Sequence, residues 1–407
     1  MSSSSKSGKS RKKTSEVEDR GRIATVANHM KALPIGAAPP ILGSRVRIWK
    51  QDPSVSGINI RDAYLHTEMT AGPSDSQMRV AGLATVHPDT NGDFLFDPES
   101  VDAFDAVHTY AVVRQVVTMY QRVLGQRLEW RNPGPISIFP HAGEGANAFY
   151  DPNAHTLEFL FFRPPGGSGR QVFTCRSLDI VAHEGGHAVL DGLKPGWLSI
   201  TSPAQTGGLH ESFGDLTSIF LVLSQLDQVE YIVAETKADL HRKNVLAEVA
   251  EEFGTALGRP SGLRNADNDL KLSEVGNEVH AISQVFTGAI YDILADAFTA
   301  SRDARRFDDA RVLYETGLRM RELTIRAIIA APNRNAVFAD VAREMLAIAE
   351  AEPERFPDYA TFIEGQFTRR EVLGATGFAG PAEIPGIPAS RVGCCGTMRL
   401  AEVRGDG

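Results

Sequence analysis

Apolar and polar residues alternate in several short stretches of the first part of the chain, and this pattern predicts strands. Turn signals stand beside two of these stretches, at Asn91-Gly92 and at Asp151-Pro152-Asn153. We therefore expect a β-rich opening region. Its predicted strands span residues 45–49, 78–84, 93–96, 136–139 and 157–162.

A helical spacing of apolar residues interrupts these strands between Asp97 and Gly125. Asp97 is a candidate N-cap, Pro98 suits the first helical position, and Gly125 is a typical stop. His108 lies on this helix, and we interpret it as an ordinary helix residue rather than a ligand. The predicted buried stripe consists of Phe104, Val107, Ala111, Val117, Tyr120 and Leu124.

Helical patterns dominate the second half of the chain, where later helices are predicted at 304–331, 336–350 and 357–372. The expected fold class is therefore α+β, with a β-rich N-terminal lobe and a mainly helical C-terminal lobe. We expect a basic, Ser-rich tail and lead-in at 1–40, the β-rich lobe at 41–192, the helical lobe at 193–378 and a Gly/Pro-rich tail at 379–407.

Composition and charge argue against several classes of protein. The 407 residues are 42% apolar and 23% charged, which is ordinary for a globular enzyme, and the net charge of −9 disfavours binding to nucleic acid. No apolar run reaches the roughly 18 residues that a membrane helix needs. The basic N-terminus lacks the apolar segment of a secretory signal, so we expect a cytoplasmic protein, or one exported without a leader. Its oligomeric state stays open.

The sequence His183-Glu184-Gly185-Gly186-His187 places two histidines four residues apart. On a helix, both imidazoles lie on one face, where they can bind a single metal ion. Zn²⁺ suits such ligands, and Glu184 can accept a proton from a water whose pKa the ion lowers to roughly 7. Ser177 is a candidate N-cap for this helix, whereas each of the paired glycines weakens a helix by about 1 kcal/mol relative to Ala.

A third ligand is predicted on the next helical stretch, where Glu211 and Asp215 are four residues apart and share a face. We assign Glu211 as the third zinc ligand. Asp215 is expected to accept the free N–H of a ligating histidine and so to fix its tautomer. His210 is a rival ligand, but it points about 100° away from Glu211 on a helix, so we interpret it as a polar helix residue.

With this pattern, the chain resembles the thermolysin-like zinc metallopeptidases, in which two histidines on one helix and a glutamate on the next bind zinc. Three further segments resemble the family in the same order. Asn147-Ala148-Phe149-Tyr150 is similar to its edge strand, which implies that Asn147 and Ala148 bind the substrate backbone. Val279-His280-Ala281-Ile282-Ser283 implies that His280 stabilises the oxyanion. Leu263-Arg264-Asn265 implies that Arg264 holds a substrate carbonyl.

The chain also departs from this family. The segment between His187 and Glu211 contains no tyrosine, so the family's tyrosine donor has no counterpart and His280 would carry more of the oxyanion stabilisation. The predicted catalytic part begins too early in this sequence for the family's inhibitory propeptide, so we expect none. Asp179 matches a carboxylate that contributes to a calcium site in the family, but its partner acids are not recognisable in the sequence, so calcium is doubtful.

The resemblance implies a zinc endopeptidase acting on peptides or proteins, with Glu184 as general base and a zinc cleft between the two lobes that the helix of His183 crosses. One alternative is a zinc aminopeptidase, although the Gly-x-Met-Glu-Asn signature of such enzymes is absent. Another is a binding protein that keeps the scaffold without catalysis, favoured by the missing tyrosine and the paired glycines. In the C-terminal tail, Cys394 and Cys395 are adjacent; they are either an incidental pair or a thiolate that blocks the zinc.

Overall fold

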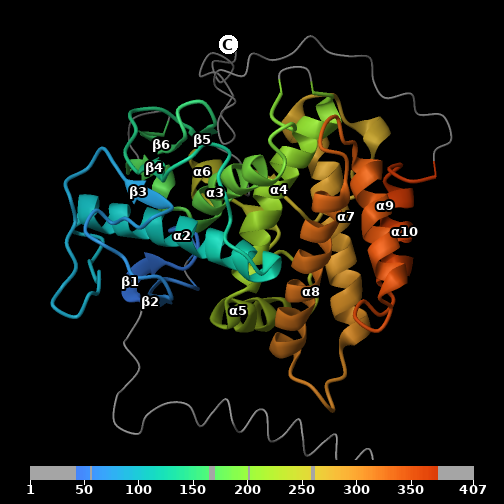
Figure 1. Ribbon diagram of the computed structural model, residues 1–407. Coiled ribbons are helices and arrows are strands. Elements are labelled where there is room, and N and C mark those ends of the chain that lie inside the picture. Colours follow the sequence, from blue (N-terminus) through green and yellow to red (C-terminus); the bar gives the residue numbers. More distant parts are fainter. Residues whose placement is uncertain (1–42, 56, 165–169, 200–201, 258–261, 375–407) are drawn as a thin grey trace, which may run out of the picture. The chain divides into compact units, whose positions relative to one another are not determined.

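The protein mixes helices with small β-sheets, an α+β arrangement, in the part of the chain that the computed structural model describes (Figure 1). Apart from two short strands, the strands precede residue 174, and all but one of the longer helices follow it. The predicted tails and the Cys394-Cys395 pair lie outside the described residues. These residues are 43–55, 57–164, 170–199, 202–257 and 262–374.

A mixed four-stranded sheet has the order β3-β4-β6-β5. Its strands β3, β4 and β6 run parallel to their neighbours, whereas β5 pairs antiparallel with β6 and lies at the edge. The other strands form antiparallel pairs, β1 with β2, β7 with β8 and β9 with β10. The strands are β1 (Ser44–Trp49), β2 (Ile60–Leu65), β3 (Met78–Val80), β4 (Ile136–Phe139), β5 (Ala148–Asp151), β6 (Thr156–Phe159), β7 (Phe161–Phe162), β8 (Val172–Phe173), β9 (Glu248–Val249) and β10 (Arg264–Asn265).

The predicted strand at 93–96 is wrong. Only Phe94 pairs there, through an isolated bridge to Val46 of β1. Asp93 accounts for the difference, because its carboxylate binds the backbone N–H of Arg45 at 2.7 Å and the Arg45 Nε at 2.9 Å. This segment therefore docks on β1 through the Asp93 side chain and the backbone of Phe94 rather than through a continued ladder. The strand predicted at 157–162 is divided into β6 and β7, and the one predicted at 78–84 ends at Val80.

The first long helix, α2 (Val101–Leu124), starts later than predicted. Asp97 and Pro98 lie before it, and the Asp97 carboxylate binds the Nη1 of Arg47 on β1 at 2.6 Å instead of capping the helix. Gly125 ends the helix in a left-handed conformation with φ of 65°, as predicted. The predicted stripe is buried except at Leu124, which is half-buried. Along this stripe α2 packs against β1 and the next long helix.

The helices α3 (Leu178–Leu193) and α4 (Ala204–Leu223) pack closely against each other. Ser177 caps α3 as predicted, since its hydroxyl accepts the backbone N–H of Ile180. A Cβ atom placed on Gly186 of α3 would lie 2.6 Å from the Thr217 Oγ1 and 3.3 Å from the Gly214 Cα, both on α4. The glycine weakens α3 as an isolated helix but permits this approach of the two backbones.

The two adjacent glycines of α3 should therefore respond differently to substitution. Gly186→Ala is expected to destabilise the protein by about 1–3 kcal/mol, because the Thr217 hydroxyl is fixed by hydrogen bonds with Tyr120 and Phe213 and cannot easily give way. Gly185→Ala is the matched control. Its Cβ would meet the Val116 side chain at an ordinary 3.6 Å, so a gain of up to about 1 kcal/mol is expected. Urea unfolding of both variants would measure the difference, and equal effects would contradict it.

Helices α4 and α7 pack against each other, and α5, α8, α9 and α10 pack against one or both of them. Helices predicted at 304–331, 336–350 and 357–372 are present as α8, α9 and α10 with shifted ends. Among the described residues, no single helix is long and apolar enough to cross a membrane; α4 and α5 meet this test only as a pair bent by 94°. The helices that follow α4 in the chain are α5 (Leu226–Thr236), α6 (Glu251–Ala256), α7 (Val279–Ser301), α8 (Asp309–Ala330), α9 (Phe338–Ala351) and α10 (Tyr359–Arg369).

Candidate metal centre

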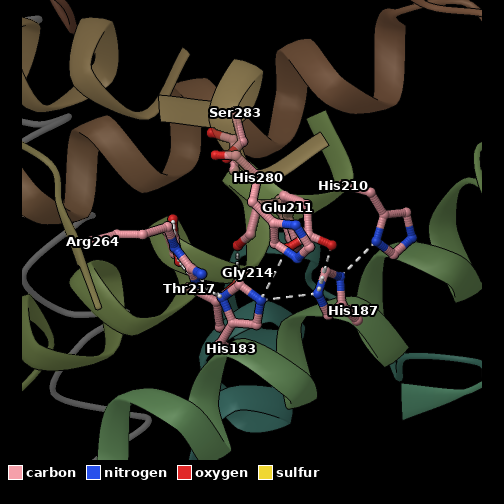
Figure 2. Close-up of polar contacts among 12 residues, drawn as sticks. His183, His187, His210, Glu211, Gly214, Thr217, Arg264, His280 and Ser283 are labelled. Carbon is pink, nitrogen blue, oxygen red and sulfur yellow. Dashed lines mark hydrogen bonds and ion pairs between the residues drawn. The ribbon is translucent and has the colours of Figure 1, made fainter. Parts of the chain in front are cut away.

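The two histidines of α3 lie one turn apart, and both are buried. Their Nε2 atoms are 3.0 Å from each other and their rings are nearly perpendicular, at 87° (Figure 2). His183 and His187 thus direct one ring nitrogen each toward a common point, as their spacing predicts.

Glu211 reaches the same point from α4. Its Oε2 is 3.5 Å from the His183 Nε2, and its Oε1 is 3.8 Å from the His187 Nε2. One ligand atom from each of the three residues lies within 4.8 Å of the others, so this group could hold a metal ion. Burial opposes ionisation of Glu211, but the nearby histidines hold the pKa of its carboxyl well below the usual range. The carboxylate is therefore available as an anionic ligand.

Asp215 and Arg264 lie behind His183. The His183 Nδ1 donates to the Asp215 Oδ1 at 2.9 Å, so the contact predicted for Asp215 is present. Arg264, on β10, donates its Nε to the Asp215 Oδ2 at 2.9 Å and its Nη2 to the Oδ1 at 2.6 Å. Although burial opposes it, Arg264 and His183 together lower the pKa of Asp215 to about 2. Arg264 thus forms an ion pair with Asp215. Its contact with a substrate carbonyl stays a prediction.

The surroundings of His183 favour positive charge. Burial alone would lower its pKa, but hydrogen bonds to Asp215 and Glu211 raise the pKa to about 9. The negative groups that favour a proton on this ring equally favour a cation between the three ligands. Two imidazole nitrogens and one carboxylate are a donor set typical of zinc and related transition metals, and the residues present therefore fit such an ion.

His210 contacts the second histidine, a role that the sequence interpretation missed. Its Nδ1 is 2.6 Å from the His187 Nδ1, and the two rings are stacked with centroids 4.8 Å apart (Figure 2). Burial lowers the pKa of His210 to about 4, so its ring is neutral and can accept the His187 Nδ1–H. His210 therefore orients His187 as Asp215 orients His183. The only sequence signal was its position directly before Glu211.

His280 lies in the first turn of α7, as predicted, and faces the same group. Its Nε2 is 3.5 Å from the Glu211 Oε2, and its Nδ1 donates to the Glu278 Oε1 at 2.5 Å. Glu278 is the N-cap of α7 and was not singled out in the sequence. Its position two residues before His280, at the expected start of the helix, could have indicated this contact. Burial opposes charge on His280, but Glu211 and Glu278 raise its pKa.

The edge strand β5 lies beside α3, and the Tyr150 hydroxyl of β5 donates to the Asp191 Oδ2 of α3 at 2.9 Å. Leu160 N donates to the Asn147 carbonyl, which makes these two residues a hydrogen-bonded pair. Antiparallel pairs alternate, so the next pair, Ala148 with Phe159, is of the other type. The peptide groups of Ala148 therefore face away from β6, toward the open edge of the sheet among the described residues.

The two remaining predicted residues are Glu184 and Asn147. Glu184 follows His183 on α3 and is fully buried. Asn147 precedes β5, and its side-chain Oδ1 is buried without a hydrogen-bond partner among the described residues. The catalytic role of the first and the substrate-binding role of the second stay predictions.

Comparison with known proteins adds no family. No family model matches the sequence, and the curated proteins contain no match either.

Asp52 is an acidic neighbour of Asp179, and Glu252 is in turn a neighbour of Asp52. Asp52 is buried near α3 and accepts the Glu252 backbone N–H at 3.1 Å. Burial raises the pKa of Asp179 well above its usual range, and the neighbouring Asp52 raises it further. Burial and Asp52 likewise raise the pKa of Glu252 to about 7. The raised pKa values favour protonated carboxyl groups here, and calcium binding by them stays untested.

This acidic group predicts that stability falls as the pH rises. Glu252 binds its proton more tightly in the folded protein than its ordinary pKa of 4.5 implies, so its contribution is present below about pH 4.5 and lost as the pH rises through about 7. Glu252→Gln should be as stable as the wild type near pH 4 but more stable by roughly 2–3 kcal/mol near pH 8, with allowance for partial exposure. Urea unfolding across this range measures it. Glu230→Gln, at an exposed position of α5, is the control, and equal pH profiles for Glu252→Gln and wild type would contradict the assignment.

Proposed function

We propose that this protein is a zinc-dependent peptidase that hydrolyses internal peptide bonds. The observation that carries the proposal is the convergence of His183, His187 and Glu211, with Asp215 and His210 fixing the two rings. Glu184 follows the first ligand on the same helix, and His280 approaches from a third helix. A metal-binding group alone has many uses, but a general base and a hydrogen-bond donor beside it are typical of hydrolysis.

In this mechanism, His183, His187 and Glu211 would hold the ion. When bound, Zn²⁺ would lower the pKa of a water in the site to roughly 7 and polarise the scissile carbonyl. The Glu184 carboxylate accepts the proton of the attacking water and returns it to the leaving amine. Its burial in α3 strengthens its interactions with charge that develops nearby.

His280 and β5 would act on the substrate. The raised pKa of His280 favours a ring with both nitrogens protonated, so that Nδ1 donates to Glu278 while Nε2 donates to the developing oxyanion. The open edge of β5 pairs with an extended peptide through the backbone of Ala148, a mode that reads main-chain groups more than side chains. We propose that the substrate occupies a cleft between the β-rich and helical lobes, crossed by α3.

One argument for an inactive scaffold has become weaker. The paired glycines of α3 favoured that alternative in the sequence, but Gly186 has a packing role against α4 that is independent of catalysis. The missing tyrosine between His187 and Glu211 still favours it.

The decisive experiment incubates the purified full chain with an unfolded protein and maps the products by mass spectrometry. The expected result is internal cleavage that a zinc chelator abolishes and added Zn²⁺ restores. A peptide blocked at both ends should also be cut, since an endopeptidase needs no free terminus. Stepwise loss of N-terminal residues would instead support an aminopeptidase. Intact substrate with fully metal-loaded protein would support the binding protein.

A further inference from the structure

A second group of metal-ligating side chains lies at the start of α3, outside the site described above. It joins Asp105 of α2, His141 after β4, and Cys175 in the short 3₁₀ helix η1 (Thr174–Arg176). One ligand atom from each residue lies within 4.8 Å of the others. Asp105 and Cys175 are fully buried, and the His141 side chain is 12% exposed. Three segments far apart in the sequence therefore bring a carboxylate, an imidazole and a thiol together.

The contacts of His141 suit a metal ligand. Its Nε2 lies 2.9 Å from the Asp105 Oδ2, at the centre of the group. Its other nitrogen, Nδ1, lies 3.5 Å from the Asp102 Oδ1 on the outer side. A proton on Nδ1 and shared with Asp102 leaves the Nε2 lone pair for an ion, which is the arrangement of a carboxylate-supported metal histidine.

The charges of the group are also suitable. Arg176 donates its Nε to the Asp105 Oδ1 at 2.7 Å, which leaves the other oxygen, Oδ2, toward His141. With Cys175 as thiolate, the negative charges of Cys175, Asp105 and Asp102 outweigh the single positive charge of Arg176. A divalent cation therefore enters a site of net negative charge.

An independent observation comes from His108, one turn from Asp105 on α2. Its side chain is fully buried, and neither of its ring nitrogens makes a hydrogen bond of good geometry among the described residues, although the Arg176 backbone interacts with the ring. The ring stacks on Phe104 with centroids 6.0 Å apart. Positions three apart share a helix face, so this imidazole borders the group. A buried imidazole without a well-formed hydrogen bond is costly unless something at the site uses its polar atoms.

We propose that Asp105, His141 and Cys175 form a second metal site, for Zn²⁺ or a similar transition-metal ion. A thiolate and an imidazole favour such an ion over calcium or magnesium. On binding, the Cys175 thiol releases its proton to solvent while the sulfur donates an electron pair to the ion, and no oxidation is involved. An ion here ties α2 and the segment after β4 to η1, directly before the helix that carries His183. Its role is thus to brace the first site from outside.

Cobalt distinguishes this site from the first, because only a thiolate ligand gives Co²⁺ a sulfur-to-metal charge-transfer band in the near ultraviolet. The metal-stripped full chain is titrated with Co²⁺. We expect the band in the wild type, in His187→Ala and in the double variant Cys394→Ser/Cys395→Ser, and its loss in Cys175→Ser. The His187→Ala variant removes the first site, and the double variant removes the tail thiols as a source.

Several results would overturn the second site. These are a wild type without the band, a band that survives in Cys175→Ser, and a band that disappears in the tail double variant. If Cys175→Ser does not fold by circular dichroism, His141→Gln decides, since it alters a partly exposed residue. It should weaken Co²⁺ binding, followed at the same band, by at least about tenfold. A His141→Gln titration that coincides with the wild type contradicts the proposal.

Discussion

Replacing Glu184 by glutamine is expected to reduce kcat/KM for peptide hydrolysis by two to four orders of magnitude, roughly 10²–10⁴-fold, while metal binding is unchanged. Glutamine keeps the size of the buried side chain but cannot accept the proton of the attacking water. The ligands His183, His187 and Glu211 are untouched, so zinc content should equal that of the wild type. Rates on the blocked peptide and zinc content of the same sample, measured by atomic emission, separate these two effects.

A surface variant provides the control for Glu184→Gln. Glu235→Gln makes the same chemical change at an exposed position of α5, so it should alter neither rate nor zinc content. A fully active Glu184→Gln would refute Glu184 as the general base. A variant that has lost zinc as well as activity would show instead that Glu184 maintains the metal centre, and the mechanism would need another base.

Replacing Asp215 by asparagine should lower both metal affinity and stability. Asparagine offers His183 a weaker acceptor, so zinc affinity should fall by about 10–100-fold. The change also leaves the Arg264 guanidinium buried beside a neutral group, which should destabilise the fold by about 3–5 kcal/mol. Zinc titration against a competing chelator and urea unfolding measure the two quantities.

The double variant Asp215→Asn/Arg264→Met separates the causes. Methionine removes the stranded charge, so we expect much of the stability to return while zinc affinity stays low. If the double variant regained wild-type zinc affinity, the loss in Asp215→Asn would come from the unpaired arginine and not from the tautomer of His183. Unchanged affinity in the single variant would contradict the orienting role of Asp215.

The parts of the site that the sequence predicted are those set by local helical geometry. His183 and His187 are four apart on α3, Glu211 and Asp215 are four apart on α4, and both pairs lie on one face as predicted. The cap at Ser177 follows equally from local hydrogen bonding. A repeat of 3.6 residues per turn fixes such relations without knowledge of the tertiary structure.

What the sequence could not predict depends on contacts between distant segments. Asp52 and Glu252 lie far from Asp179 in the chain, and nothing local links them. The pairing of Arg264 with Asp215 is of the same kind. The strand expected at 93–96 failed for a related reason, because β-propensity does not register a side chain that binds a neighbouring strand's backbone.

His210 illustrates a different limit. Adjacent positions on a helix differ by about 100°, and that was the reason to separate His210 from Glu211. Close packing of α3 on α4 places the His187 ring between Glu211 and His210. Glu211 then faces the Nε2 of this ring, and His210 faces its Nδ1. Glu211 and His210 point in different directions on α4 and thus contact different nitrogens of the His187 ring. Only the distance between helices, set in part by Gly186, reveals this.

The unpaired side of β5 also has a consequence for the protein in solution. Unpaired backbone N–H and C=O groups along an edge strand can bind any extended chain. A second molecule of this protein, or a partly unfolded one, therefore competes with substrate for the backbone groups of β5. β5 is only four residues long and ends at the acidic Asp151, and both properties discourage self-association. Lengthening the strand by engineering would therefore invite aggregation.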